Sequence, residues 1–290
     1  EEEEEEVTFP LELRELDVEA DEESEDGQHC WAGLASEQWM VRGPQVRAHP
    51  ASWEHPPTPQ TAHASHHPLP LLPSQYTRDK VKMPSATGSQ LLCVEAFRHT
   101  AGVFDAAGRA GSPIDAVASR CAEELDSIFV CSLMLPATGF VWHVVFYFGL
   151  FGPLPPHVAA LIERFRGGDD KFRNARFKLI AKIVDGPWLV RKTVPSKPAI
   201  LGKTVPLLFP TGAAKGTRRG YFGVDVDTTR SSAANRVLSV VKGNAPALVV
   251  DLAFLLEAQA DDELPEMCLG SGRISHIELS AEKVPALEGE

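Results

Sequence analysis

Residues 127–148 have the sequence SIFVCSLMLPATGFVWHVVFYF, within a longer run, 127–162, that contains no Asp, Glu, Lys or Arg. An uncharged run of this length is long enough to cross a bilayer as a helix. Pro136 and Gly139 interrupt it, however, and Phe, Val, Trp and Tyr, which favour strands, dominate its composition. The sequence therefore predicts two strands, about 127–135 and 140–148, joined by a turn at 136–139, and no transmembrane helix.

Further elements are expected on both sides of this hairpin. Apolar spacing and helix-start signals predict helices at 112–126 and 156–166, and a long helical region at 232–259 with a kink near Pro246. Short strands are expected at 38–46, 90–98, 188–194, 201–209, 221–227 and 273–279. This pattern is typical of an α+β domain. The expected architecture is a curved, mostly antiparallel sheet packed on a long, kinked C-terminal helical region.

Charge and composition divide the 290 residues into parts. Residues 1–26 hold fifteen acidic residues and one Arg, a net charge of −14, so the remaining residues contribute +2 to the overall −12. We expect residues 1–29 to form an acidic disordered tail. Residues 30–290 are expected to form a single domain, interrupted by a disordered insertion at 48–75 that holds seven Pro and five His.

The five Cys show no CxxC spacing, and no positively charged segment precedes an apolar run. Reduced thiols and no secretory signal are therefore expected. The predicted location is the cytoplasm, where the protein could also associate peripherally with membranes. No cofactor is expected. The near-neutral globular part argues against a nucleic-acid partner.

Residues 164–192 contain nine Lys or Arg against three Asp, with Phe and Trp between the charges. Basic residues interleaved with aromatic residues suit a surface that meets phosphate or anionic lipid. The candidate lipid- or anion-binding residues are Arg173, Arg176, Lys178, Arg191 and Lys192. The alternative interpretation is structural, with these charges paired to carboxylates elsewhere in the fold.

Acidic residues suggest two other kinds of site. Asp225 and Asp227 lie two positions apart on a predicted strand, so their side chains share a face and they are weak candidates for a metal site. The structural alternative is that they pair with basic residues, or that Asp227 caps the following helix. Asp251 lies in an apolar segment and needs a partner, for which Arg42, Arg173 and Arg176 are candidates.

The basic segment also carries a family resemblance. Gly-Asp-Asp at 168–170, Phe-Arg-Asn-Ala-Arg-Phe-Lys-Leu-Ile at 172–180 and Gly-Pro-Trp at 186–188 resemble the C-terminal domain of the plant enhanced disease resistance 2 proteins. Further matches extend the resemblance over roughly residues 30–287. The residues of these matches that are interpreted as structural are Arg42, Gly43, Asp169, Asn174, Trp188 and Asp251.

The resemblance implies a plant or algal protein without enzymatic activity. Proteins of this family carry the domain after pleckstrin-homology and START-like lipid-transfer domains. Their founding member is a negative regulator of defence and cell death, associated with membranes and phosphoinositide. The prediction is a lipid- and membrane-associated regulatory module that docks on anionic phospholipid through the basic-aromatic segment. The alternatives are a START-like pocket for an apolar lipid ligand and a metal-dependent transferase or hydrolase that uses Asp225 and Asp227. No motif for a protein partner is apparent.

Overall fold

The computed structural model describes residues 30–42, 82–85, 89–121, 125–194, 197–277, 279–282 and 284–287. The predicted acidic tail at 1–29, the predicted insertion at 48–75 and Gly43 lie outside these residues. The described chain forms two large sheets and a separate two-stranded ribbon, which consists of β2 (Met40–Arg42) and β3 (Lys82–Pro84).

The first large sheet, called the six-stranded sheet below, has the order β10-β11-β5-β6-β4, with β9 also paired to β11. Its centre is the hairpin predicted from the uncharged run, which the structure confirms, and β11 joins β5 in parallel register. The strands are β4 (Ser89–His99), β5 (Leu125–Pro136), β6 (Val141–Phe151), β9 (Leu207–Leu208), β10 (Thr211–Gly212) and β11 (Tyr221–Asp227).

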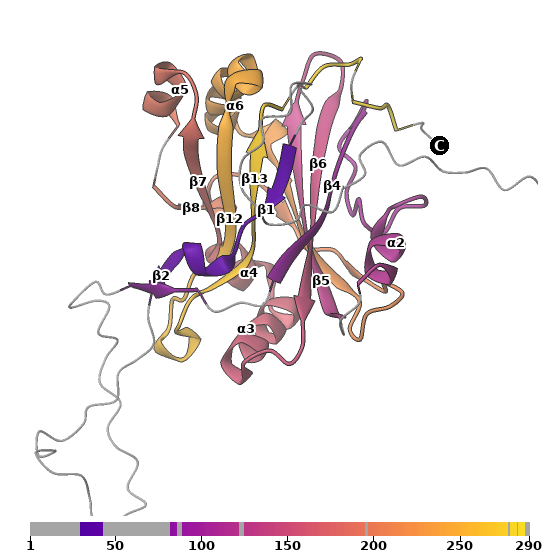
Figure 1. The fold of residues 1–290 in the computed structure, drawn as a ribbon, viewed down its shortest axis with the longest axis vertical. Helices are drawn as coiled ribbons and strands as arrows, with labels where there is room; N and C mark the ends of the chain where they lie inside the picture. Colours follow the sequence, from indigo (N-terminus) through magenta and orange to yellow (C-terminus); the bar gives the residue numbers. More distant parts are fainter. Residues whose placement is uncertain are drawn as a thin grey trace, which may run out of the picture.

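The second large sheet, called the five-stranded sheet below, has the order β1-β13-β12-β7-β8, and all its pairings are antiparallel. It lies beside the first sheet in Figure 1. Its strands are β1 (Cys30–Gly33), β7 (Phe177–Asp185), β8 (Ala199–Ile200), β12 (Val249–Leu256) and β13 (Met267–Ser275).

Aromatic rings from both sheets fill the space between them. Phe129 and Phe148 of the six-stranded sheet lie 5.9 Å apart, and Phe254 of β12 lies 6.4 Å and 5.9 Å from them, measured between ring centroids. Gly270 of β13 faces the same cluster, where a Cβ would overlap the Phe148 ring. The two sheets therefore pack face to face through a continuous apolar core.

Both large sheets are also covered on their outer faces. Ile128 and Val130 of β5 pack with residues of the loop at 103–107 and of α2 (Ile114–Ser119). On the other sheet, Ala253 and Leu255 of β12 pack under Trp39 and Val41. Strands buried on both faces need apolar residues at every position, which explains the uncharged sequence of the hairpin.

The structure contradicts the predicted fold class. Helix α6 (Ser232–Asn244) is followed by a short 3-10 turn, η4 (Ala245–Ala247), and then by β12, so there is no long, kinked C-terminal helical region. A buried helix and a strand covered on both faces are both apolar on all sides, so the pattern of 249–256 did not distinguish them. The protein consists mainly of two packed sheets, with short helices at the periphery (Figure 1).

Other local predictions had mixed outcomes. The helix at 156–166 and the strand at 221–227 are confirmed by α3 (Pro156–Gly167) and β11. The strand predicted at 188–194 is wrong, because this segment is helix α5 (Trp188–Thr193). The segment 201–209 contains a 3-10 turn, η2 (Leu201–Lys203), and only two residues of strand. No helix in the described part of the chain is both long and apolar enough to cross a membrane.

Candidate functional site

The basic-aromatic segment 164–192 covers the end of α3, helix α4 (Asp170–Arg176), β7 and most of α5. Asp169 begins α4 by accepting a hydrogen bond from the Phe172 N–H at 2.7 Å. The chain then enters the five-stranded sheet at Phe177 and leaves it at Asp185. The five candidate basic residues therefore lie on three different elements, which separate them into a paired group and an exposed group.

Arg176 belongs to the paired group. Its guanidinium forms a two-pronged ion pair with Glu263, with Nη2 2.7 Å from Oε1 and Nε 3.0 Å from Oε2, and it stacks on the Phe172 ring. The Glu263 side chain is 0% exposed. Burial alone would raise the pKa of Glu263, but the hydrogen bonds from Arg176 and from the N–H groups of Gln259 and Ala260 hold that pKa below its usual value. This pair joins α4 to the segment that precedes β13.

Lys178 and Arg42 share two further carboxylates. Lys178 Nζ lies 2.9 Å from Glu266 and 3.5 Å from Glu257, and its side chain is only 7% exposed. Arg42 contacts the same two residues at 3.3 and 3.6 Å. Two cations and two carboxylates therefore neutralise one another where the two-stranded ribbon meets the five-stranded sheet.

Arg173 and Asn174 face the loop that follows β8. Arg173 pairs with Asp170 at 2.8 Å and stacks on the ring of Phe209. Gly202 packs so closely on Asn174 that a Cβ at this position would overlap it. Arg173, Arg176 and Lys178 thus all have an acidic partner within the fold.

Asp251 has a different partner from those the sequence suggested. It lies directly opposite Arg273 in the β12–β13 register, and the two side chains form hydrogen bonds of 2.7 and 3.1 Å. The buried carboxylate does have the guanidinium partner that its burial requires. Because the segment is a strand and not a helix, the neighbouring strand supplies this partner.

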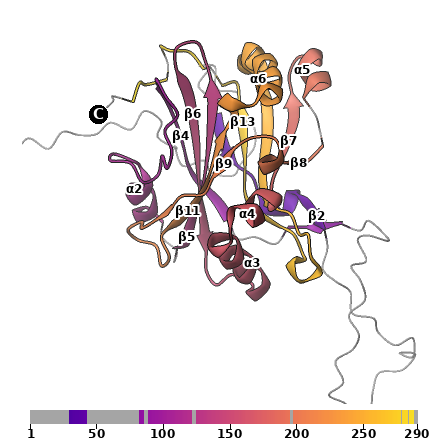
Figure 2. The same ribbon diagram turned by 180° about the vertical axis from the view of Figure 1, so that it is seen from behind.

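The exposed group lies on α5, which projects beside α6 at one end of the molecule (Figures 1 and 2). Trp188 is 68% exposed and Leu189 is 53% exposed, and the next turn carries the exposed Arg191 and Lys192. Lys192 Nζ lies 5.0 Å from the centre of the Trp188 ring. Val190 is fully buried and anchors the helix. We call Trp188, Leu189, Arg191 and Lys192 the α5 patch.

Gly186 and Pro187 direct the chain from β7 into α5. Gly186 has φ 143°, a conformation that favours glycine, and a Cβ there would overlap Leu248. The Pro187 carbonyl accepts the first hydrogen bonds of the helix, from the N–H groups of Val190 and Arg191. Pro187 immediately precedes the helix, where its restricted φ is compatible with helix initiation. This Gly-Pro pair was the sequence signal that favoured a helix over the predicted strand.

Asp225 and Asp227 are both buried in β11. Asp225 accepts a hydrogen bond from the Asp105 N–H at 2.7 Å, and burial raises the pKa of its carboxyl group to about 7. Asp227 pairs with Arg230 at 3.2 Å and caps the following turn through the Thr229 N–H. Within the described ranges, no three His, Cys, Asp or Glu side chains are placed to hold a metal ion. Both carboxylates thus have partners within the fold.

Comparison with known proteins gives the family. The family model described as "Protein ENHANCED DISEASE RESISTANCE 2, C-terminal" matches residues 73–278. The chain belongs to this family. A protein from Arabidopsis thaliana named "Protein ENHANCED DISEASE RESISTANCE 2-like" is 36% identical over 215 residues, which cover 73% of this chain and 28% of that protein. The chain thus spans less than a third of the length of this relative. No solved structure matches it.

The ENHANCED DISEASE RESISTANCE 2 match covers the whole of α4, β7 and α5, and it leaves Arg42 outside. Of the four residues of the α5 patch, Arg191 and Lys192 are predicted from the sequence as candidate lipid-binding residues and Trp188 is interpreted as structural, whereas Leu189 is not among the predicted site residues. A strand at 188–194 would place Leu189 opposite Trp188 in the alternation of faces. On the helix, the side chains of Trp188 and Leu189 are both exposed, so the α5 patch presents two large apolar side chains instead of one.

Proposed function

We propose that this chain is a non-enzymatic regulatory module that docks on anionic membranes through the α5 patch. Family membership supports a defence-related regulatory role, and the α5 patch supports the docking. The observation that carries the proposal is the exposure of Trp188 and Leu189 beside Arg191 and Lys192. Trp is favoured at membrane interfaces because its ring is apolar and its N–H is polar, and basic residues attract the anionic headgroups.

The size of the patch implies weak and reversible docking. Each of the two basic residues contributes about 1 kcal/mol near an anionic surface. Burial of a large apolar side chain contributes roughly 1.5–3 kcal/mol, and less for Trp188 and Leu189 because they are already partly buried. The sum, about 4–6 kcal/mol, corresponds to dissociation constants from roughly the millimolar range down to tens of micromolar. Stable attachment would need a second contact elsewhere in a longer protein.

The other basic residues are assigned to the fold in this proposal. Arg173, Arg176 and Lys178 are each neutralised by a neighbouring carboxylate, so little of their charge remains available to lipid. The contacts of Asp225 and Asp227 similarly disfavour a metal-dependent transferase or hydrolase. The face-to-face packing of the sheets disfavours a START-like cavity between them.

Liposome flotation of the full chain tests the proposal. The vesicles are phosphatidylcholine alone, or phosphatidylcholine with phosphatidylinositol 4-phosphate, each at low and high salt. We expect flotation with the anionic vesicles at low salt and a strong decrease at high salt, because the headgroup attraction is screened. The variants Trp188→Ala/Leu189→Ala and Arg191→Glu/Lys192→Glu should both abolish it.

A matched control reverses two exposed charges outside α5, in the variant Lys171→Glu/Lys203→Glu. This variant has the same change in net charge, so it should retain most of the flotation if docking is local. Equal losses in the control and in Arg191→Glu/Lys192→Glu would indicate a general charge effect and contradict the proposed surface. Absence of flotation for the folded chain at low salt would contradict docking itself.

A further inference from the structure

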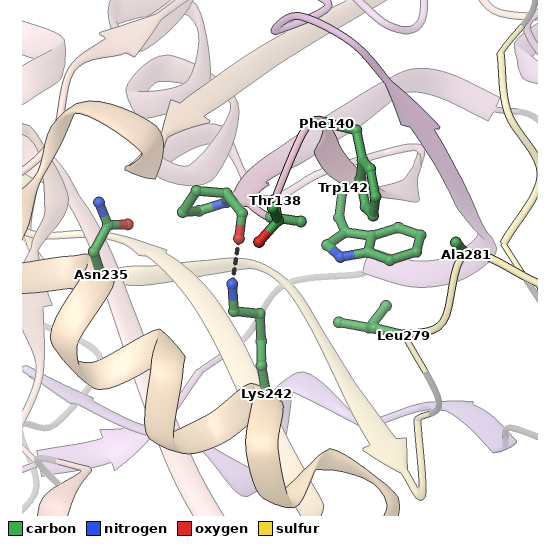
Figure 3. A pocket seen from close by; sticks show the side chains of 9 residues that line it. Thr138, Phe140, Trp142, Asn235, Lys242, Leu279 and Ala281 are labelled. Carbon is green, nitrogen blue, oxygen red and sulfur yellow. Dashed lines mark hydrogen bonds between the residues drawn. The ribbon is translucent and has the colours of Figure 1, made fainter.

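A groove lies between α6, the β5–β6 turn and residues 279–281 (Figure 3). We call it the α6 groove. Its volume is about 560 Å³, which is in the range of sites for small ligands. Phe140, Trp142 and Leu279 provide an apolar wall, in which the two aromatic rings meet edge to face at 4.7 Å. A hydrocarbon chain could lie against this wall and exclude water from it.

Lys242 supplies the one charge among the described side chains that line the groove. It extends from the last turn of α6 and donates a hydrogen bond to the Pro136 carbonyl (Figure 3). Its ammonium group has three donors, so two remain for a ligand. Within the described residues no Asp or Glu forms an ion pair with it. Among the described residues, the arrangement is a partly buried cation without a carboxylate partner at one end of an apolar wall.

Burial lowers the pKa of Lys242 from its usual value. Desolvation of the ammonium group is the cause, and an anion placed beside it would offset this cost. A single ammonium group matches a singly charged anion. A phosphate dianion would require additional donors or cations, and the other described residues that line the groove carry no charge.

We propose that the α6 groove binds a fatty acid, with its carboxylate at Lys242 and its hydrocarbon chain along Phe140, Trp142 and Leu279. Thr138 lies beside Lys242 in Figure 3, and its hydroxyl is a second donor within the same part of the groove. None of the described residues that line the groove belongs to the α5 patch, so ligand binding here does not depend on membrane docking.

Titration calorimetry of the full chain tests the charge requirement. Dodecanoate, used below its micellar concentration, is compared with dodecanol, which has the same chain length and no charge. We expect one dodecanoate per chain, bound about tenfold more tightly than dodecanol, since the charge-assisted hydrogen bond is lost with the alcohol. Lys242→Met should reduce dodecanoate affinity to that of dodecanol, while Lys242→Arg should retain the preference. Lys203→Met is the matched control and should behave as the original chain.

A second set of variants tests the location. Leu279→Trp enlarges a side chain of the apolar wall so that it occupies the space of the hydrocarbon chain, and it should weaken dodecanoate binding about tenfold or more. This variant keeps the test valid if Lys242→Met does not fold. Arg191→Glu/Lys192→Glu should leave dodecanoate binding unchanged even though it abolishes flotation.

Three results would overturn the proposal. One is equal affinity for dodecanoate and dodecanol. Another is unchanged binding in folded Lys242→Met. The third is loss of dodecanoate binding in the Arg191→Glu/Lys192→Glu variant, which would place the ligand on the α5 patch.

Discussion

Replacement of Glu263 by Gln tests whether the paired group of basic residues holds the fold together. Glu263 is fully buried and accepts hydrogen bonds from Arg176, from the Gln259 N–H and from the Ala260 N–H. Gln keeps the size of the side chain and one acceptor oxygen, but it removes the charge. Arg176 would then be a largely buried cation without its acidic partner.

Removal of one partner from a buried pair typically costs about 3–5 kcal/mol. A domain of this size loses roughly 2–4 °C in thermal midpoint per kcal/mol, so Glu263→Gln should lower the midpoint by about 10 °C. Urea unfolding, followed by circular dichroism and tryptophan fluorescence, gives the free energy of unfolding. Coincident transitions with the two probes would justify a two-state treatment.

The neighbouring residue provides the matched control. Asp262 pairs with Arg164 at 3.1 Å, but its side chain is 71% exposed. Asp262→Asn should therefore cost less than about 1 kcal/mol. The variant Arg176→Gln/Glu263→Gln should be less destabilised than the sum of its single changes, because neither charge is left unpaired. A cost for Glu263→Gln as small as that of Asp262→Asn would refute the structural role of this pair and return Arg176 to the candidate ligand-binding residues.

Three further predictions concern buried positions. The raised pKa of Asp225 means that this carboxyl group binds a proton more tightly in the folded state than in the unfolded state. The stability that Asp225 contributes is therefore complete below about pH 4 and is lost as the pH rises through about 7, with a slope of up to about 1.4 kcal/mol per pH unit. Urea unfolding from pH 4 to 8 should show that Asp225→Asn lacks this pH-dependent component. Gly270→Ala should lower the free energy of unfolding by about 1–3 kcal/mol in the same assay, because the new methyl group overlaps the Phe148 ring. Arg273→Gln should destabilise the protein more than Asp251→Asn in urea, because the first change leaves a buried carboxylate and the second leaves a guanidinium that is 39% exposed.

Each of these predictions can fail separately. The same pH slope in Asp225→Asn and the original chain would show that this carboxyl group titrates normally in the folded protein. An unchanged free energy of unfolding for Gly270→Ala would mean that β13 can move away from Phe148. If the two changes to the Asp251 pair have equal cost, burial of the carboxylate does not determine its energetics.

The sequence was most informative where one local pattern had one physical explanation. Pro136 and Gly139 lie between the two apolar segments 127–135 and 140–148 of the uncharged run, so the hairpin followed from the residues themselves. The sequence also indicated that Asp251 needs a partner, because an unpaired buried carboxylate is too costly. The identity of that partner depended on the strand register.

The same kind of reasoning failed where two structures satisfy one pattern. Residues 249–256 are apolar on every side, which suits a buried helix as well as a strand covered on both faces. Only the presence of β7 and β13 on either side decides for the strand. Residues 188–194, which have no strong periodicity, are predicted as a strand, but most of this segment forms α5, and the Gly-Pro pair before it favours a helix.

The sequence by itself determined the family, the central hairpin and the presence of an unusually basic segment with interleaved aromatic residues. Only the tertiary structure decided which of those charges face solvent. Arg176 pairs with Glu263 and Lys178 with Glu266, which lie 87 and 88 residues later in the chain. Arg191 and Lys192 remain exposed on a projecting helix. The physical reason is that pairing and burial depend on segments brought together by folding, and local residue patterns do not contain that information.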